Sequence, residues 1–199
     1  MKLYNLISVL FHPIVIPTIS VLAYLTAIPN YFSSQQKLSI LGLIFLTTYI
    51  IPLIILILFK ELKLIKSFNA TEIKERKKPL AIMILLFYIL GNTLSKIDYL
   101  YDFSMLFYAT TLGLILIYIL FFWKIKTSIH LLSMGVSVGF FCVLTSIYNT
   151  NLNVLIITLI LLSGIVASAR LHLKAHTPKE VYLGFLIGFS SPICCYFLL

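Results

Sequence analysis

A histidine and a glutamate near the C-terminal end of the chain have the types and spacing of a site for chemistry on phosphate. Glu180 follows His176 by four residues and is the only side-chain carboxylate after position 102. A carboxylate that accepts one imidazole N–H fixes the ring tautomer and raises the basicity of the other nitrogen. Arg170 lies six residues before His176, and a guanidinium is shaped to hold two phosphate oxygens at once. Together these residues predict nucleophilic attack on phosphorus.

A second group brings a cation, a hydroxyl and an imidazole together between positions 126 and 130. Lys126 and Ser128 are suited to bind phosphoryl oxygens, and His130 could donate a proton to a leaving oxygen. The alternative is that these residues lie at the membrane interface and extend their polar ends into water.

A third group is the charge-dense run 72–79, which ends in Pro79. Lys74, Arg76 and Lys78 supply cations there, and the proline is expected to open the following helix. A transferring phosphoryl group carries charge on several oxygens, so cations from three segments would stabilise it. The alternative is an ordinary solvated basic loop.

The spacing of His172 and His176 allows one other kind of site. On a continuous helix the two imidazoles and Glu180 would share a face and could bind zinc. A single carboxylate among many cations suits phosphate better than a divalent ion, so we expect a site without metal or cofactor. His12, which precedes Pro13, is expected to mark a kinked helix or an interface feature.

The composition requires membrane helices to position these groups. The chain has 199 residues, of which 61% are hydrophobic and 11% are charged, whereas soluble domains carry about 25% charged residues. No Gly/Ser-rich linker divides it, so we expect residues 1–199 to form one integral membrane domain. The apolar runs are continuous, which favours helices over the alternating strands of a barrel. We therefore predict an all-α transmembrane bundle.

Seven apolar runs are candidates for crossing the membrane, which takes about 20 apolar residues. The run 80–94 is short, so the predicted number of crossings is six or seven. The glycine pairs Gly135 with Gly139 and Gly184 with Gly188 have the spacing that allows helices to approach closely. The runs are 3–28, 38–59, 80–94, 104–123, 131–148, 152–169 and 181–199.

The formal net charge of +9 belongs to a membrane protein, in which basic residues set the orientation or meet phosphate. We therefore expect no nucleic-acid partner. With seven crossings, every Lys and Arg except Lys37 and Lys96 falls on the side that holds the N-terminus and the three groups. The positive-inside rule places that side in the cytoplasm.

The region around Arg170 resembles a signature of the type 2 phosphatidic acid phosphatase superfamily. That family's third signature is S-R-x5-H-x3-D. The present chain has the same spacing from Arg170 to His176 and Glu180, with Ala169 in place of the serine and glutamate in place of the aspartate.

The two earlier groups resemble the other signatures less closely. Lys126-Thr-Ser-Ile-His130 is similar to the second signature, P-S-G-H, and retains its serine and histidine. Lys78-Pro79 stands where the first signature, K-x6-R-P, has R-P, and threonine at position 71 replaces the lysine. The resemblance runs from Lys74 to the final apolar run.

This resemblance implies a helical-bundle enzyme of the cell membrane, here expected to be bacterial, that hydrolyses a lipid phosphate or diphosphate without metal. His176 would attack phosphorus and form a phosphohistidine, Glu180 would hold its other ring nitrogen, and His130 would protonate the departing oxygen. The implied partners are a lipid phosphate substrate and membrane lipids. The implied phosphate-binding residues are Arg170, Lys126, Ser128, Arg76, Lys74 and Lys78.

Two alternatives remain open at this stage. The basic face could belong to a multi-pass transporter or to a protein that binds anionic lipids without catalysis. Family members that handle exported lipid carriers work on the outer face, so the resemblance and the charge distribution favour opposite sides. We adopt the cytoplasmic prediction. Phosphatidate, phosphatidylglycerophosphate and polyprenyl diphosphate fit the residues equally well.

Overall fold

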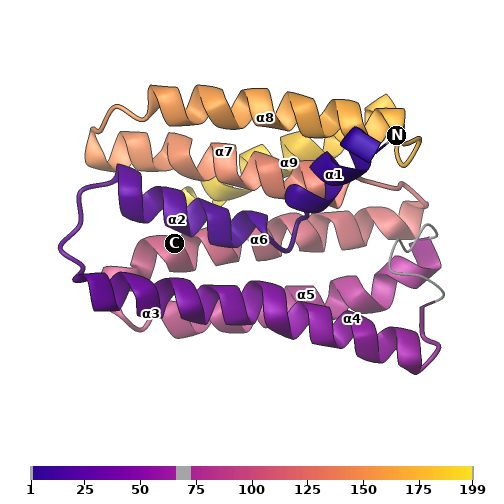
Figure 1. The fold of residues 1–199 in the computed structure, drawn as a ribbon, viewed down its shortest axis with the longest axis horizontal. Helices are drawn as coiled ribbons and strands as arrows, with labels where there is room; N and C mark the ends of the chain where they lie inside the picture. The colour runs from indigo at the N-terminus through magenta and orange to yellow at the C-terminus, as the bar shows by residue number, and fades with distance from the viewer. Residues whose placement is uncertain (1, 66–72, 199) are drawn as a thin grey trace.

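The computed structural model of the protein describes residues 2–65 and 73–198, and over these residues it consists of helices and short connections without a strand (Figure 1). Most of the helices lie along the long axis of the molecule, with the short α1 set at an angle to them. They are α1 Lys2–Leu10, α2 Ile16–Ala27, α3 Ser34–Phe45, α4 Ile51–Glu61, α5 Ile73–Leu94, α6 Tyr101–Leu120, α7 Ile129–Tyr148, α8 Asn153–His172 and α9 Pro178–Leu198.

Six helical segments within the described ranges are long and apolar enough to cross a membrane. One of them combines α3 and α4 through a π-helical turn at Leu46–Ile50. The predicted all-α, multi-pass architecture is therefore confirmed. The six segments are Ser34–Glu61, Ile73–Leu94, Asp98–Trp123, Ile129–Tyr148, Asn153–His172 and Pro178–Leu198.

The first apolar run, 3–28, is not one helix, contrary to the sequence prediction. α1 ends at Leu10 and α2 begins at Ile16. The break falls at His12 and Pro13, where proline lacks the N–H that a continuing helix would need. A kinked helix or an interface feature was expected at His12, whereas the structure has a full break there, which leaves two helices that are each too short to cross alone.

The run 80–94 was expected to be short, and it is part of a longer helix. α5 begins at Ile73 and has 22 residues, which at about 1.5 Å per residue reaches the roughly 30 Å of a hydrocarbon core. Lys, Arg and Glu are good helix formers, so the charged run continues the helix. The sequence predicted that Pro79 opens a helix. This prediction was wrong, because Pro79 lies inside α5.

The glycine pairs bring α7 and α9 into backbone contact, as predicted. A side chain at Gly135 would collide with the carbonyl of Phe185, and one at Gly188 would collide with the carbonyl of Leu132. α7 is also the most deeply buried of the six segments. The two helices therefore form a closely packed centre for the bundle.

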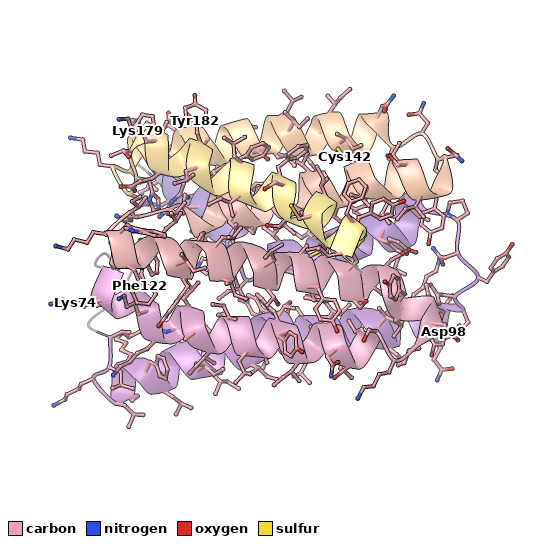
Figure 2. The ribbon with its side chains drawn as sticks, turned by 180° about the vertical axis from the view of Figure 1, so that it is seen from behind. Lys74, Asp98, Phe122, Cys142, Lys179 and Tyr182 are labelled. Carbon is pink, nitrogen blue, oxygen red and sulfur yellow. The ribbon has the colours of Figure 1, made fainter. Side chains whose placement is uncertain are left out.

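The two ends of the bundle carry different groups. The N-terminus, the ends of α4, α6 and α8, and the starts of α5, α7 and α9 meet at one end (Figure 1). In Figure 2, Lys74 and Lys179 lie at this end and Asp98 lies at the other. Near that other end, Asp102 of α6 accepts hydrogen bonds from Tyr24 of α2 at 2.6 Å and from Tyr148 of α7 at 2.5 Å.

Candidate active site

The turn between α8 and α9 is built by residues that end one helix and start the next. Lys174 adopts a left-handed conformation with φ of 51°, and the N–H of Ala175 donates to the carbonyl of Arg170 at 3.1 Å. α9 then starts at Pro178, where its fixed φ suits a first helical turn. The Thr177 hydroxyl accepts from the N–H of Glu180 at 3.4 Å, as an N-cap residue does.

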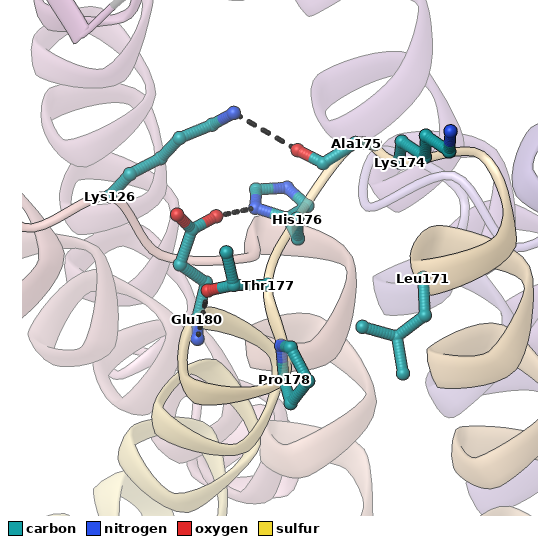
Figure 3. Close-up of a pocket in the computed structure, with 8 residues that line it drawn as sticks. All are labelled: Lys126, Leu171, Lys174, Ala175, His176, Thr177, Pro178 and Glu180. Carbon is teal, nitrogen blue, oxygen red and sulfur yellow. Dashed lines mark hydrogen bonds and ion pairs between the residues drawn. The ribbon is translucent and has the colours of Figure 1, made fainter.

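This helix start places Glu180 beside His176. Nδ1 of His176 lies 2.6 Å from Oε2 of Glu180, and the His176 side chain is 1% exposed. The positive end of the helix dipole favours a carboxylate in the first turn of α9. Figure 3 shows the second ring nitrogen, Nε2, turned away from Glu180, and it makes no hydrogen bond within the described ranges. The neutral ring therefore donates from Nδ1 and leaves the lone pair of Nε2 available.

The zinc alternative required one helix to carry both histidines. α8 ends at His172, and His176 lies in the turn before α9, so the two imidazoles do not share a helical face. The ring of His172 stacks on Tyr4 at a centroid distance of 3.9 Å. Among residues 2–65 and 73–198 no three metal-ligating side chains form a cluster.

The entrance to α7 brings two hydroxyls to the same turn. Ser128 immediately precedes α7, but its side chain does not cap the helix. Thr127 and Ser128 are both fully buried, and their hydroxyl oxygens have no partner in the described part of the chain. The backbone N–H of Ser128 donates to the carbonyl of Glu180 at 3.1 Å. The second sequence group, 126–130, is therefore joined directly to the segment that carries His176 and Glu180.

Lys126 links the same two segments through its side chain. Nζ donates to the carbonyl of Ala175 at 3.0 Å (Figure 3). Burial lowers the pKa of Lys126, the neighbouring Arg76 and Arg170 lower it further, and Glu180 opposes them. Lys126, His176 and Glu180 all line a cavity of about 520 Å³ at this end of the bundle.

Two arginines also reach this site. Nη1 of Arg76 donates to the carbonyl of Thr127 at 3.4 Å. Nη1 of Arg170 donates to the hydroxyl of Ser8 at 2.7 Å, while Nε of Arg170 is buried without a partner in the described ranges. The two guanidiniums come from α5 and α8, so cations from separate helices converge here.

The other cations of the third group, 72–79, do not converge in this way. Lys74 and Lys78 are exposed and make no hydrogen bond to a described residue, and Lys74 points away from the bundle in Figure 2. Because α5 is helical from Ile73, Arg76 lies on a different side of it from these two lysines. Lys66, Thr71 and Glu72 lie outside the described residues.

His130 is the second residue of α7 and lies against the N-terminal segment. Its Nε2 is 3.2 Å from the carbonyl oxygen of Ser8 and 3.4 Å from the hydroxyl. The ring of His12 meets it edge to face at 5.3 Å. Sequence reasoning did not select Ser8. Its one signal was the four-residue spacing to His12, which is common in helices.

The electrostatic surroundings keep His176 neutral. Burial lowers the pKa of His176, the hydrogen bond to Glu180 raises it, and the positive charges of Arg76, Arg170 and Lys126 lower it again. The pKa lies below its usual value, so the ring at neutral pH is unprotonated at one nitrogen. A neutral imidazole oriented by a carboxylate and surrounded by cations can attack an anionic phosphorus centre.

Comparison with known proteins adds no relative: no family model, no curated protein and no solved structure matches this chain.

Proposed function

We propose that the protein is a metal-independent phosphatase that hydrolyses a lipid phosphate or diphosphate through a phosphohistidine. The observation that carries this proposal is the 2.6 Å contact between His176 and Glu180 at a place where three cations from different segments act on the imidazole.

The first step forms a bond between nitrogen and phosphorus. The lone pair on Nε2 of His176 attacks phosphorus, the bond from phosphorus to the leaving oxygen breaks, and that oxygen takes a proton from His130. Glu180 stabilises the positive charge that develops on the attacking ring. The product of this step is a phosphohistidine and the dephosphorylated lipid.

The second step restores the enzyme. Water attacks phosphorus, the bond from phosphorus to Nε2 breaks, and inorganic phosphate leaves. The lost proton of the water passes to the group that protonated the leaving oxygen, which is the reverse of its first role.

The phosphoryl oxygens find donors of two kinds at this site. Arg76, Lys126 and Arg170 supply positive charge, which stabilises the charge spread over the transferring group. The hydroxyls of Thr127 and Ser128 are buried without partners in the described ranges, and buried polar groups of this kind are rare. Phosphoryl oxygens would satisfy them.

The position of the site supports a lipid substrate. The site lies at one end of a bundle whose six apolar segments are long enough to span a bilayer. A phosphate held there would be level with lipid headgroups, while its chains remain in the hydrocarbon.

The competing function is a transporter or an anionic-lipid-binding protein that uses the same basic end. Nothing in such a role requires a histidine paired with a carboxylate at 2.6 Å. Its support is the absence of the glycine and lysine that the second and first signatures would contain.

Phosphate release by the purified protein tests the proposal. The protein in lipid nanodiscs is given phosphatidate, phosphatidylglycerophosphate or polyprenyl diphosphate, with and without a chelator. We expect turnover of at least one substrate in chelator, and no turnover by His176→Ala. Acid-labile phosphate on the wild-type protein, absent from the variant, would identify the intermediate. Activity that His176→Ala retains, or that returns only with added metal, would refute the mechanism.

A further inference from the structure

One residue of the N-terminal helix α1 contacts both a proposed phosphate-binding residue and the proposed proton donor. The hydroxyl of Ser8 accepts from Nη1 of Arg170 at 2.7 Å, and its backbone carbonyl lies 3.2 Å from Nε2 of His130. Ser8 is the one buried residue of α1. A serine that is buried in a short apolar helix and meets a guanidinium and an imidazole differs from an ordinary packing residue.

The hydrogen bond from Arg170 to Ser8 occupies one edge of the guanidinium and leaves the other edge available to bind phosphate. A guanidinium can hold two phosphate oxygens through paired N–H groups. Ser8 takes a proton of Nη1, the nitrogen on the same side as the side-chain carbons. The Nε–H belongs to the opposite, side-on edge, and it is buried without a partner in the described ranges. The serine thus fixes the rotation of the planar group with that edge free.

The contact with His130 has a similar consequence. The carbonyl oxygen of Ser8 can only accept, so Nε2 of His130 carries a proton there. Nδ1 is then the nitrogen that carries the second proton when the ring is protonated, and it is from there that His130 would give a proton to the leaving oxygen. One residue therefore orients a proposed phosphate-binding side chain and a proposed proton donor.

Packing holds α1 in the position that this requires. Ile7 and Phe11 pack on a buried cluster that includes Val166 of α8 and Leu131 of α7. Tyr4 stacks on His172 at the end of α8. Ser8 lies between these contacts, so its hydroxyl is presented to Arg170 by a docked helix.

We propose that Ser8 is a positioning residue of the active site, which aligns the Nε edge of Arg170 on the phosphoryl group of the substrate. This inference rests on the proposed phosphatase function and adds α1, a segment outside the stretch that carries the family resemblance, to the catalytic unit. Ser8 acts through Arg170 and does not itself touch phosphorus.

The test is a double-mutant cycle in the full-length protein. Ser8→Ala removes the hydroxyl and keeps the carbonyl contact with His130. We expect it to lower kcat/KM by about tenfold and to weaken inhibition by inorganic phosphate, while Ser8→Thr retains most activity. In an Arg170→Lys background, Ser8→Ala should change kcat/KM by less than about twofold. Asn5→Ala, an exposed change on the same helix, is the matched control.

Each outcome of this cycle either supports or overturns the positioning role of Ser8. Wild-type kinetics in Ser8→Ala, or an equal loss with and without Arg170→Lys, would overturn the positioning role and leave the phosphatase proposal intact. Failure of the phosphatase proposal would instead appear as activity in His176→Ala or as no turnover in the wild type. If Ser8→Ala does not fold, Ser8→Cys replaces the oxygen with a weak acceptor and is compared in the same cycle.

Discussion

Glu180 occupies a position in α9 where a glutamate commonly bonds back to the N-cap backbone. The sequence Thr177-Pro-Lys-Glu180 has the capping-box pattern, and the Thr177 hydroxyl does accept from the N–H of Glu180. The carboxylate reaches one residue further, to Nδ1 of His176. A local helix-start motif is thus combined with the orientation of the proposed nucleophile.

At this scale the first prediction concerns Glu180→Gln. The change is nearly isosteric and removes the charge that stabilises the ring as it bonds to phosphorus. We expect an intact fold and a loss of at least about tenfold in the rate of phosphoenzyme formation, measured by rapid quench. Glu61→Gln, an exposed change at the same end of the bundle, should be silent. A folded and fully active Glu180→Gln protein would argue against the pairing.

The second prediction concerns pH. Attack requires unprotonated Nε2, so kcat/KM should fall at low pH as His176 becomes protonated. Burial is the largest cause of its lowered pKa, and Arg76 is the largest contributor among the cations. Removing that charge in Arg76→Gln should raise the pKa and move the acidic limb of kcat/KM to higher pH. Lys63→Gln, which changes an exposed cation, should leave the limb in place, and an unmoved limb in Arg76→Gln would contradict the assignment.

The residues that could be predicted are those whose partners lie nearby in sequence. His176 and Glu180 are four residues apart and span one helix start, so their contact follows from local geometry. The choice of Arg76 over Lys74 and Lys78 depends on the rotation of α5 about its axis. The role of Ser8 depends on the docking of a distant helix, and neither of these is encoded in local spacing.

At the scale of the elements, the contact between α7 and α9 fixes the site. Gly184 lies directly against the backbone of Ser128, one turn after Glu180. The N–H of Ser128 donates to the carbonyl of Glu180 beside it. The glycine pairs were predicted as packing features, and the structure shows that one of them also joins the two halves of the candidate site.

We therefore predict that Gly184→Ala loses both stability and activity. The added methyl group would collide with the Ser128 carbonyl, so α9 must move away from α7, at a cost of about 1–3 kcal/mol. The measurements are the thermal midpoint and kcat/KM in one detergent. Gly164→Ala is the control, because a methyl group there meets nothing within 4 Å. Retention of both properties in Gly184→Ala would show that the contact is looser than described.

Where an element begins and ends was harder to predict than its existence. The bundle and most apolar runs follow from hydrophobicity alone. Pro13 ended a helix and Pro79 did not, although both follow polar residues. Propensity favours continuation through the charged residues before Pro79, whereas α1 has already ended at Leu10, before Pro13.

At the scale of the whole molecule, the two ends of the bundle have separate tasks. The end with His176 carries the proposed chemistry, and the other end is fastened by Asp102, which joins α2, α6 and α7 through Tyr24 and Tyr148. The charge-assisted bonds there are stronger than neutral ones. Sequence reasoning did not foresee this cluster, because its members come from three distant segments.

Asp102→Asn should lower stability without affecting activity. The variant loses the negative charge that accepts from both tyrosines, and we expect the thermal midpoint to fall by an amount corresponding to about 1–3 kcal/mol. kcat should stay near the wild-type value, since the proposed site lies at the far end. Asp98→Asn, an exposed change nearby, serves as the control. A drop in kcat at unchanged midpoint would mean that this end takes part in turnover.

Orientation in the membrane is the last prediction. The N-terminus and the proposed site share one end (Figure 1), and that end collects most of the basic residues, so the positive-inside rule predicts a cytoplasmic site. Lys179 is exposed there. On a background with the native cysteines replaced, Lys179→Cys should resist a membrane-impermeant maleimide in intact cells and react after lysis. Labelling in intact cells would place the site outside.

Because the helix breaks at His12 and Pro13, α1 packs on the bundle separately from α2. One face of α1 carries Ser8 toward Arg170, while Leu3, Leu6 and Val9 are each more than half exposed on the outside. If the bundle lies in a bilayer, acyl chains solvate that outer face. The surrounding lipid would then affect the reaction. For one substrate and the same reacting groups, acyl-chain length and detergent would alter turnover by changing how α1 packs on the bundle.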